Sequence, residues 1–259
     1  MYHQNYDQCF QTPQKRWIFV PTDECRDKGK SFTDLVLKKW SPPCYFFHLQ
    51  PGGHIAALEE HGQNSYFAKI DLRRFFDHIS KNRIIRALKE IGIGYQYRAK
   101  EIAEWSVVVS KEDRNKRILP YGFVQSQMLA SLCLDKSAIG SFLKNGISEN
   151  TKVSCYVDDI IISSNDREEL AADYGSLVSA VSKAKFSINE EKSHRPQDRS
   201  TAFNVNFGGA YMRITEERFF TFKEAVQVDG RSKRTDAIKA YVTRICPDQG
   251  EELKAILIR

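Results

Sequence analysis

The sequence predicts an α+β fold built around an antiparallel sheet. Residues 153–164, VSCYVDDIIISS, place apolar segments on both sides of a short polar tip, which is the pattern of a tight hairpin. Strand-like and helix-like segments are mixed along the chain in the order strand, helix, helix, hairpin, helix, strand and hairpin, which favours the α+β class. The 259 residues, 41% of them hydrophobic, are enough for one large domain or two small ones with a sizeable core.

Residues 1–50 are mostly irregular in pattern. One strand is predicted at 16–21, RWIFVP, which ends at a proline. The polar stretch at 22–34 is predicted to be a loop. A Pro-Gly-Gly turn follows at 51–53, and HIAALEEH at 54–61 is expected to form one or two turns of helix.

A strand and two helices are predicted next. Residues 65–72, SYFAKIDL, have the composition of a strand, and a charged, aromatic turn follows them. Ser80 is suited to cap a helix that ends near Gly92 or Gly94. A second helix is predicted for 97–110.

The second half of the chain begins with a charged loop at 111–122. Apolar residues recur at helical spacing over 125–144, and Asp166 is expected to cap a further helix over 167–184. The remaining predicted elements are a strand at 186–192, a hairpin around Gly208 and Gly209 within 202–215, and helices at 231–246 and 250–259. The last four residues, ILIR, carry no helix stop signal, which predicts that further sequence follows them.

Charge and cysteine content limit the class of protein. A net charge of +6 is compatible with a nucleic-acid partner, although many soluble proteins share such an excess. The six cysteines form no CxxC pair and no zinc-ligand spacing, which is typical of a reducing compartment. The polar N-terminus does not have the pattern of a signal peptide, and no apolar stretch is long enough to span a membrane. We therefore expect a cytoplasmic protein without a membrane partner.

Adjacent carboxylates occupy the tip of the hairpin predicted at 153–164. Asp158 and Asp159 lie between apolar segments, where like charges repel and resist burial unless a cation neutralises them. Asp71 ends the strand predicted at 65–72, and it would lie against this tip if the two strands pair. Mg²⁺ prefers carboxylate oxygens, and two such ions can activate a hydroxyl and stabilise a leaving pyrophosphate. For the Asp pair alone, the alternative is a solvated turn.

Five blocks of sequence carry a resemblance to a known family. YVDD at 156–159 resembles the central metal-binding motif of reverse transcriptases, and AKIDLRRFFDHI at 68–79 is similar to the metal-binding motif that precedes it. The other three blocks resemble further motifs of the family: LPYGFVQSQMLAS at 119–131, FSINEEKSH at 186–194 and FNVNFGGAYM at 203–212. All five occur in the order of the family, within residues 65–215. The sequences of the segments FFDHIS and GFVQS look most like those of bacterial retron, group II intron and defence-associated enzymes.

This resemblance implies a right-hand polymerase fold, with fingers and palm around the central antiparallel sheet and the start of a helical thumb. The implied division of the chain is part of the fingers at 1–64, palm at 65–80, fingers and palm helices at 81–118, palm with the primer-grip hairpin at 119–215, and the start of the thumb at 216–259. The implied activity is that of an RNA-directed DNA polymerase, which is a nucleotidyltransferase.

The resemblance also implies a catalytic site with two Mg²⁺ ions, for which Mn²⁺ is an alternative. Asp71 and Asp158 would be the principal metal ligands, and the backbone carbonyl of Leu72 would complete one metal site. Asp159 would be a weaker third ligand or would support the other two. Lys192 aligns with the lysine thought to protonate pyrophosphate as it leaves, and the equal alternative is a surface lysine.

The nucleotide-binding residues are carried over in the same way. The backbone amides of Arg74 and Phe75 would face the triphosphate, while the side chains of Arg73 and Arg74 would reach phosphate or template or else lie exposed. Phe76 stands where an aromatic ring closes on the sugar and excludes a 2′-hydroxyl, which implies deoxynucleotide substrates. Alternatively, both phenylalanines are core residues. The remaining predicted dNTP-binding residues are Lys15, Arg16, Tyr121 and Gly122.

Template and primer contacts are implied for two segments. They comprise Gln125, Ser126 and Gln127 of the loop and helix at 119–131, and Phe207, Gly208 and Gly209 of the primer-grip hairpin. The sequence departs from the family at Gln127, where a proline is usual, and at Tyr121, where a glutamine often stands. These departures concern template handling more than metal binding.

The implied partners are an RNA template, which could be a dedicated non-coding RNA, a DNA primer or product, dNTPs, and a protein partner or a second copy of the chain. A role in antiviral defence follows from the resemblance alone. Three alternatives stay open: template-independent DNA synthesis on the same fold, a palm-type nucleotidyl cyclase, and an inactive assembly subunit. A cyclase needs neither the primer-grip hairpin nor the thumb-like tail, and the retained carboxylates, with Phe76 and Lys192, argue against an inactive subunit.

Overall fold

The computed structural model describes residues 5–94 and 98–256, and a central antiparallel sheet organises them. Its strands are β3 (Tyr66–Arg73), β6 (Lys152–Tyr156), β7 (Asp159–Ser164), β8 (Ser187–Ile188) and β9 (His194–Gln197). The spatial order is β6-β7-β3-β8, and β9 also pairs with β3. The predicted hairpin is therefore formed by β6 and β7, and it lies beside the predicted strand β3. The register of β3 and β7 sets Asp71 opposite Asp159.

Apolar residues on both faces explain why this sheet is central. β3 is buried from Phe67 to Leu72, and β7 is buried from Ile160 to Ser164. Ile70 belongs to the larger of two hydrophobic clusters, whereas Phe67 belongs to the smaller one, so each face of the sheet packs on a different core. Strands that are covered on both faces have nearly continuous apolar sequences, as these do. Helix α7 (Arg167–Lys183) packs on β3 and β7, and Asp166 caps it as predicted.

The N-terminal half supplies a hairpin and most of the helices. The hairpin is β1 (Tyr6–Gln11) with β2 (Trp17–Pro21), and it lies against α1 (Asp23–Leu37). The short helices η1 (Phe47–Leu49) and α2 (Gly53–Glu59) precede β3, and η2 (Phe75–His78) follows it. The other elements are α3 (Lys81–Glu90), α4 (Arg98–Trp105), β4 (Val108–Val109), β5 (Arg117–Ile118), α5 (Ser126–Asp135) and α6 (Ala138–Asn145).

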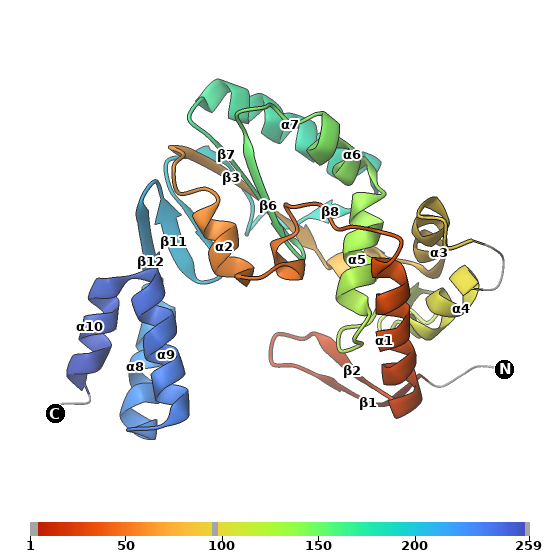
Figure 1. The fold of residues 1–259 in the computed structure, drawn as a ribbon, viewed down its shortest axis with the longest axis horizontal. Coiled ribbons are helices and arrows are strands. Elements are labelled where there is room, and N and C mark those ends of the chain that lie inside the picture. Colours follow the sequence, from red (N-terminus) through yellow and green to blue (C-terminus); the bar gives the residue numbers. More distant parts are fainter. Residues whose placement is uncertain (1–4, 95–97, 257–259) are drawn as a thin grey trace.

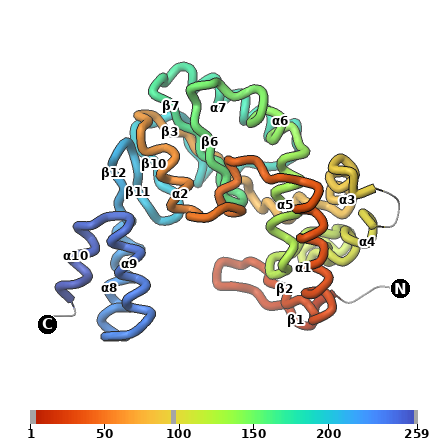
Figure 2. Tube along the Cα trace, viewed as in Figure 1, coloured from red at the N-terminus to blue at the C-terminus, as the bar shows by residue number. Residues whose placement is uncertain are grey.

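The C-terminal part adds a small sheet and three helices. The sheet contains β10 (Ser200–Ala202), β11 (Val205–Gly208) and β12 (Tyr211–Ile214), and the helices are α8 (Glu216–Asp229), α9 (Lys233–Ile245) and α10 (Pro247–Ile256). The ribbon has the shape of an arch, with α8–α10 at one end, α1 and the β1–β2 hairpin at the other, and the central sheet between them (Figure 1). The Cα trace shows the same arrangement (Figure 2).

The prediction of a loop at 22–34 is wrong, because these residues form most of α1. The buried positions of this helix are Cys25, Gly29, Phe32 and Val36, which recur every three or four residues on one face. Two of these four residues are small, so the apolar stripe is hidden by the polar composition around it. Thr22 accepts a hydrogen bond from the backbone N–H of Cys25 and caps the helix.

Three other boundaries differ from the predictions. The helix at 97–110 ends at Trp105, because the valines that follow pair with β5; its first residue, Tyr97, lies outside the described residues. The stretch 125–144 is two helices, since Ser137 caps a new helix, α6. The helix predicted at 250–259 begins at Pro247, and residues 257–259 lie outside the described residues. The predictions also lack β1, β10 and α8.

Within residues 5–94 and 98–256, no helix is both long enough and apolar enough to cross a membrane.

Candidate active site

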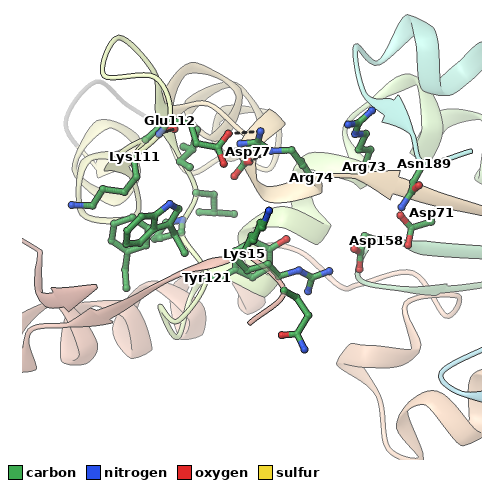
Figure 3. A pocket seen from close by; sticks show the side chains of 18 of the residues that line it. Lys15, Asp71, Arg73, Arg74, Asp77, Lys111, Glu112, Tyr121, Asp158 and Asn189 are labelled. Atoms are coloured by element: carbon green, nitrogen blue, oxygen red, sulfur yellow. Dashed lines mark hydrogen bonds and ion pairs between the residues drawn. The ribbon is translucent and has the colours of Figure 1, made fainter. Parts of the chain in front are cut away.

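The candidate site is built where the β6–β7 turn meets the end of β3. Val157 has a φ of +61°, in the left-handed region that a β-branched residue rarely adopts, and this turns the chain sharply before Asp158. The backbone N–H of Leu72 then donates a hydrogen bond of 2.8 Å to the carbonyl of Asp158. The register and this bond place Asp71 beside Asp158, and Figure 3 shows their side chains close together.

Asp159 has a different partner. Its carboxylate forms an ion pair of 2.8 Å with the ammonium of Lys69, and the two side chains are only 18% and 8% exposed. Lys69 lies two residues before Asp71 on β3, on the same face of the sheet. The charge of Asp159 is thus balanced within the protein, whereas Asp71 and Asp158 face the cavity described below. Sequence reasoning missed Lys69, because a lysine within an apolar strand gives no signal of its partner.

Burial and charge crowding act on Asp158. Burial raises the pKa of Asp158 to about 6, and the neighbouring carboxylates of Asp159 and Asp71 add to the shift. A divalent cation between Asp71 and Asp158 would relieve this crowding, and Mg²⁺ bound by two carboxylates completes its shell with water and substrate phosphates. Within the described residues, no cluster of three or more His, Cys, Asp or Glu side chains forms a ready metal cage.

Cations and aromatic residues line the cavity into which the two carboxylates open. The cavity has a volume of about 320 Å³. It gathers residues from the β1–β2 turn, the end of β3, the β4–β5 loop, the loop before α5, the β6–β7 turn and the β8–β9 loop. These residues include Lys15, Arg16, Asp71, Arg73, Arg74, Lys111, Tyr121, Asp158, Asn189 and Lys192 (Figure 3). Of the predicted metal-binding and nucleotide-binding residues, the cavity thus brings together all but Leu72, Phe75, Phe76, Gly122 and Asp159. Two further acidic residues, Asp77 and Glu112, also line the cavity, and both pair with Arg74.

The β1–β2 hairpin is fixed to this cavity through Tyr121 and Gly122. The backbone N–H of Phe19 in β2 donates to the carbonyl of Tyr121 at 2.9 Å. Gly122 has a φ of +106°, and a Cβ atom there would lie 2.2 Å from the carbonyl oxygen of Phe19. Only glycine allows this approach of the two backbones.

Gly122→Ala should therefore separate β2 from the loop at 119–122. We expect a loss of about 2–4 kcal/mol in the free energy of unfolding, because the added methyl group meets backbone atoms in a strained conformation. Urea unfolding measures this loss. The control is Gly53→Ala, at a positive φ of +57° with open space around the new Cβ, for which about 1 kcal/mol is expected. Equal losses in the two variants would contradict the close approach.

Phe75 and Phe76 differ in their surroundings. Phe75 is fully buried and packs against Phe186, so it is a core residue, as the alternative interpretation expected of at least one of the pair. Phe76 is 6% exposed, and its ring lies 4.5 Å from that of Tyr121, which lines the cavity. Phe76 thus belongs to the larger core and touches the lining of the cavity through Tyr121.

The loop after β8 approaches Asp71 from the other side. The backbone N–H of Asn189 donates to the carbonyl of Asp71 at 2.9 Å, and the hydroxyl of Ser193 accepts from the N–H of Asp71 at 2.9 Å. The ammonium of Lys192 lies 4.0 Å from the carboxylate of Asp71, and its side chain is 57% exposed. Lys192 is thus free to move within the cavity.

Arg74 is held inside the protein's own charge network. Its guanidinium donates to Asp77 at 2.5 Å and also pairs with Glu112. Arg74 is the N-cap residue of η2 and has a φ of +51°. Arg73 lines the cavity with no ion pair among the described residues, which leaves its charge available to a ligand.

Three predicted template and primer residues do not reach the surface. Gln125 is fully buried, where its amide donates to the carbonyl of Trp105 and the hydroxyl of Ser106, and Ser126 is 3% exposed. Phe207 is 2% exposed in the smaller core. Packing uses the side chains of these three residues, so their contacts with template or primer stay a prediction that only their backbone could meet. Gln127 is partly exposed, as are Gly208 and Gly209 at the β11–β12 turn.

His48 supports the catalytic turn, and sequence reasoning missed it. The backbone N–H of Val157 donates to its Nδ1 at 3.0 Å, and its Nε2 lies 2.6 Å from the hydroxyl of Ser131 in α5. Ser131 in turn donates to the carbonyl of Gln127 at 2.9 Å. Burial lowers the pKa of His48 to about 4, so the ring is neutral, accepts at Nδ1 and donates at Nε2. A directed chain of hydrogen bonds thus links α5 to the YVDD turn.

Comparison with known proteins identifies the family. The model of the family described as reverse transcriptase (RNA-dependent DNA polymerase) matches residues 12–228. The chain belongs to the reverse transcriptase family. The match covers all the elements that form the cavity, so the right-hand polymerase fold expected from the sequence is confirmed. No curated protein matches the chain.

Solved structures agree on the fold. A foamy viral protease-reverse transcriptase in complex with double-stranded DNA shares 18% identity at a TM-score of 0.55, over 96% of this chain and 37% of that one. The foamy viral enzyme in complex with an RNA/DNA hybrid shares 15% identity at a TM-score of 0.53, over 95% of this chain and 29% of that one. A telomerase from Candida albicans shares 10% identity at a TM-score of 0.45, over 91% of this chain and 45% of that one. The chain thus spans less than half the length of these proteins.

Proposed function

We propose that this reverse transcriptase is an RNA-directed DNA polymerase that adds dNTPs to a 3′-hydroxyl by two-metal phosphoryl transfer. The observation that carries the proposal is that Asp71 and Asp158 open into one cavity that is also lined by the cations Lys15, Arg16, Arg73 and Lys192. A triphosphate needs both features, because a metal must bridge its oxygens while cations meet the remaining charge. Family membership supports the same chemistry.

Each residue has a defined part in this proposal. Two Mg²⁺ ions would activate the 3′-hydroxyl and stabilise the leaving pyrophosphate. Asp71 and Asp158 would hold them, with the carbonyl of Leu72 at one ion, while Asp159 stays paired with Lys69 and fixes the turn. Lys15, Arg16 and Arg73 would meet the triphosphate. Lys192, 4.0 Å from Asp71, is in reach of a leaving pyrophosphate and would give it a proton.

The subtype and setting are part of the proposal. The sequences of the segments FFDHIS at 75–80 and GFVQS at 122–126 support a bacterial enzyme of the retron, group II intron or defence-associated kind. Such an enzyme would work in the cytoplasm with a structured RNA, and antiviral defence is the role that this likeness favours. The proposed division into fingers, palm and thumb follows the elements at the two ends and the centre of the arch (Figure 1).

Primer extension with purified protein and Mg²⁺ tests the proposal. The substrates are poly(rA) with oligo(dT), a heteropolymeric RNA with a DNA primer, and dNTPs without template. Extension that follows the template sequence is the expected result. Synthesis without template would replace RNA direction by template-independent synthesis on the same cavity. Absence of synthesis together with absence of Mg²⁺ binding would contradict a polymerase and favour an assembly subunit.

Phe76→Ala tests the selection of deoxynucleotides. Removal of the ring beside Tyr121 opens space at the proposed sugar position, so we expect the preference for dNTP over rNTP in kcat/KM to fall about tenfold or more, since discrimination by shape is worth about 1–3 kcal/mol. Single-nucleotide incorporation with dUTP and UTP, which differ only in the 2′-hydroxyl, measures it. The control is Phe75→Leu, a change in the core behind the cavity. If selectivity stays constant in Phe76→Ala, Phe76 is only a core residue.

A further inference from the structure

A second cationic cavity lies outside the candidate active site. It has a volume of about 270 Å³ and is formed by α3, the connection between α5 and α6, and the C-terminal end of α7. We call it the α3–α7 pocket; its charged lining residues are Arg83, Arg86, Glu90, Lys136, Lys183 and Lys185. It shares no residue with the carboxylate cavity. In Figure 1, α3, α6 and α7 lie on the outer side of the arch, away from α8–α10.

The charges of the α3–α7 pocket are poorly balanced. Five cations face one acidic residue, Glu90. Lys136 is paired with the buried Asp135 at 3.2 Å. Within the described part of the chain, the other four cations, Arg83, Arg86, Lys183 and Lys185, form no ion pair within 4.0 Å. Like charges gathered from separate elements repel one another, so this arrangement costs stability unless an anion binds among them.

Arg83 is the fixed centre of the α3–α7 pocket. Its Nη2 donates to the carbonyl of Ala184 at 2.6 Å, and its guanidinium lies 4.3 Å from the ring centroid of Phe186. Its Nη1 is buried without a hydrogen-bond partner among the described residues. Burial lowers the pKa of Arg83, and the charge of Arg86 acts in the same direction. A preorganised guanidinium with an unused donor, next to a second arginine, matches the geometry with which proteins bind phosphate.

We propose that the α3–α7 pocket binds a backbone phosphate of an RNA segment that runs outside the active site. Three exposed or half-exposed cations around a fixed arginine suit a polyanion that passes over several elements better than a single enclosed ion. The choice of RNA rests on the proposed function, whereas the phosphate chemistry rests on the pocket alone. A structured RNA held here would keep a template attached to the enzyme while its end occupies the catalytic cavity.

Neutralisation of the rim tests this proposal without disturbing the buried arginine. The variant is Arg86→Gln/Lys183→Gln/Lys185→Asn; asparagine is chosen because Lys185 has a φ of +57°. Fluorescence anisotropy of a long hairpin RNA, and of a short primer–template duplex, is measured over a range of salt concentrations. We expect affinity for the long RNA to fall about tenfold or more. The slope of log affinity against log salt concentration should decrease by the amount that corresponds to about two phosphate contacts. Affinity for the short duplex and its extension should remain within about twofold of wild type.

The matched control is Lys38→Gln/Lys39→Gln/Lys100→Gln, which removes two exposed lysines just after α1 and one in α4. An equal loss of RNA affinity in this control would mean that the loss comes from the lower net charge of the protein, and it would overturn the proposal that the α3–α7 pocket is the binding site. Unchanged affinity for the long RNA, or a change only in the binding of inorganic phosphate, would overturn RNA as the ligand. Asp158→Asn separates the two proposals: it should bind the long RNA like wild type while extension is lost. Extension that survives Asp158→Asn overturns the proposed function but leaves the RNA result standing.

Discussion

Asp158→Asn should abolish primer extension and leave the protein as stable as before or more stable. The proposed metal site loses one of its two carboxylates, and metal stabilisation of the transition state is worth several kcal/mol, so kcat should fall about 10³-fold or more. In the absence of metal, the charged form of Asp158 is disfavoured by burial and by its neighbours. Its removal should therefore raise the free energy of unfolding by about 1 kcal/mol at neutral pH. Steady-state extension and urea unfolding measure the two effects.

Asp159→Asn is the matched control, because it changes the adjacent residue of the same turn in the same way. Asp159 balances the buried charge of Lys69. Its removal leaves that ammonium without its partner, so we expect a loss of about 1–3 kcal/mol in stability, less than for a deleted side chain because asparagine keeps a dipole. Two neighbouring Asp→Asn changes should thus have opposite signs. If both variants are destabilised equally, the assignment of separate roles to the two carboxylates is wrong.

The pH and Mg²⁺ dependence of stability follow from the same shift. The pKa of Asp158 in the folded state is raised above its ordinary value of 3.8, so the folded state is favoured while Asp158 is protonated. Without metal, this stabilisation is lost as pH rises through about 6. Mg²⁺ reverses this, since it binds the charged carboxylates of the folded state only. Thermal unfolding at pH 7 should therefore show stabilisation by Mg²⁺ in wild type and much less in Asp158→Asn. Equal stabilisation of both would place the metal elsewhere.

The central sheet and its carboxylates could be predicted because their sequence signals are local. A strand that is covered on both faces is apolar at nearly every position, as β3 and β7 are. The polar tip between β6 and β7 then fixes where the chain turns. Pairing of these strands was an assumption at the level of sequence, and the observed register of Asp71 with Asp159 confirms it.

Long-range packing explains what could not be predicted. Gly29 in α1 leaves room for the side chain of Gln125, 96 positions away in sequence, since a Cβ atom there would lie 2.3 Å from its Oε1. Without knowledge of this contact, neither helix α1 nor the burial of Gln125 can be predicted from the sequence. Lys69 and His48 are similar cases, because each acts through one partner that only the fold brings close. A lone histidine in an aromatic segment carries no local signal that it will hold the β6–β7 turn.

His48→Ala should lower kcat by about 10–100-fold, because it removes the acceptor that holds Val157 in its strained conformation and lets the YVDD turn shift. We expect a loss of about 2–4 kcal/mol in stability as well. His48→Gln, which can accept and donate at similar positions, should recover much of kcat. Single-turnover extension at saturating dNTP, on protein shown to be folded by circular dichroism, measures the step itself rather than binding.

His61→Ala separates a catalytic effect of His48 from general destabilisation. His61 is also buried and neutral, with its pKa lowered by burial to about 3, and its two ring nitrogens lie 2.6 and 2.8 Å from the hydroxyls of Ser163 and Ser154. It lies in the turn between α2 and β3 and binds strands β7 and β6 of the same sheet, and among the described residues it has no hydrogen bond to the β6–β7 turn. Its removal should cost a similar stability, while kcat of the folded enzyme stays within about twofold. A similar fall in kcat for both histidines would mean that the chain from Gln127 through Ser131 and His48 to Val157 supports the fold alone and does not position Asp158.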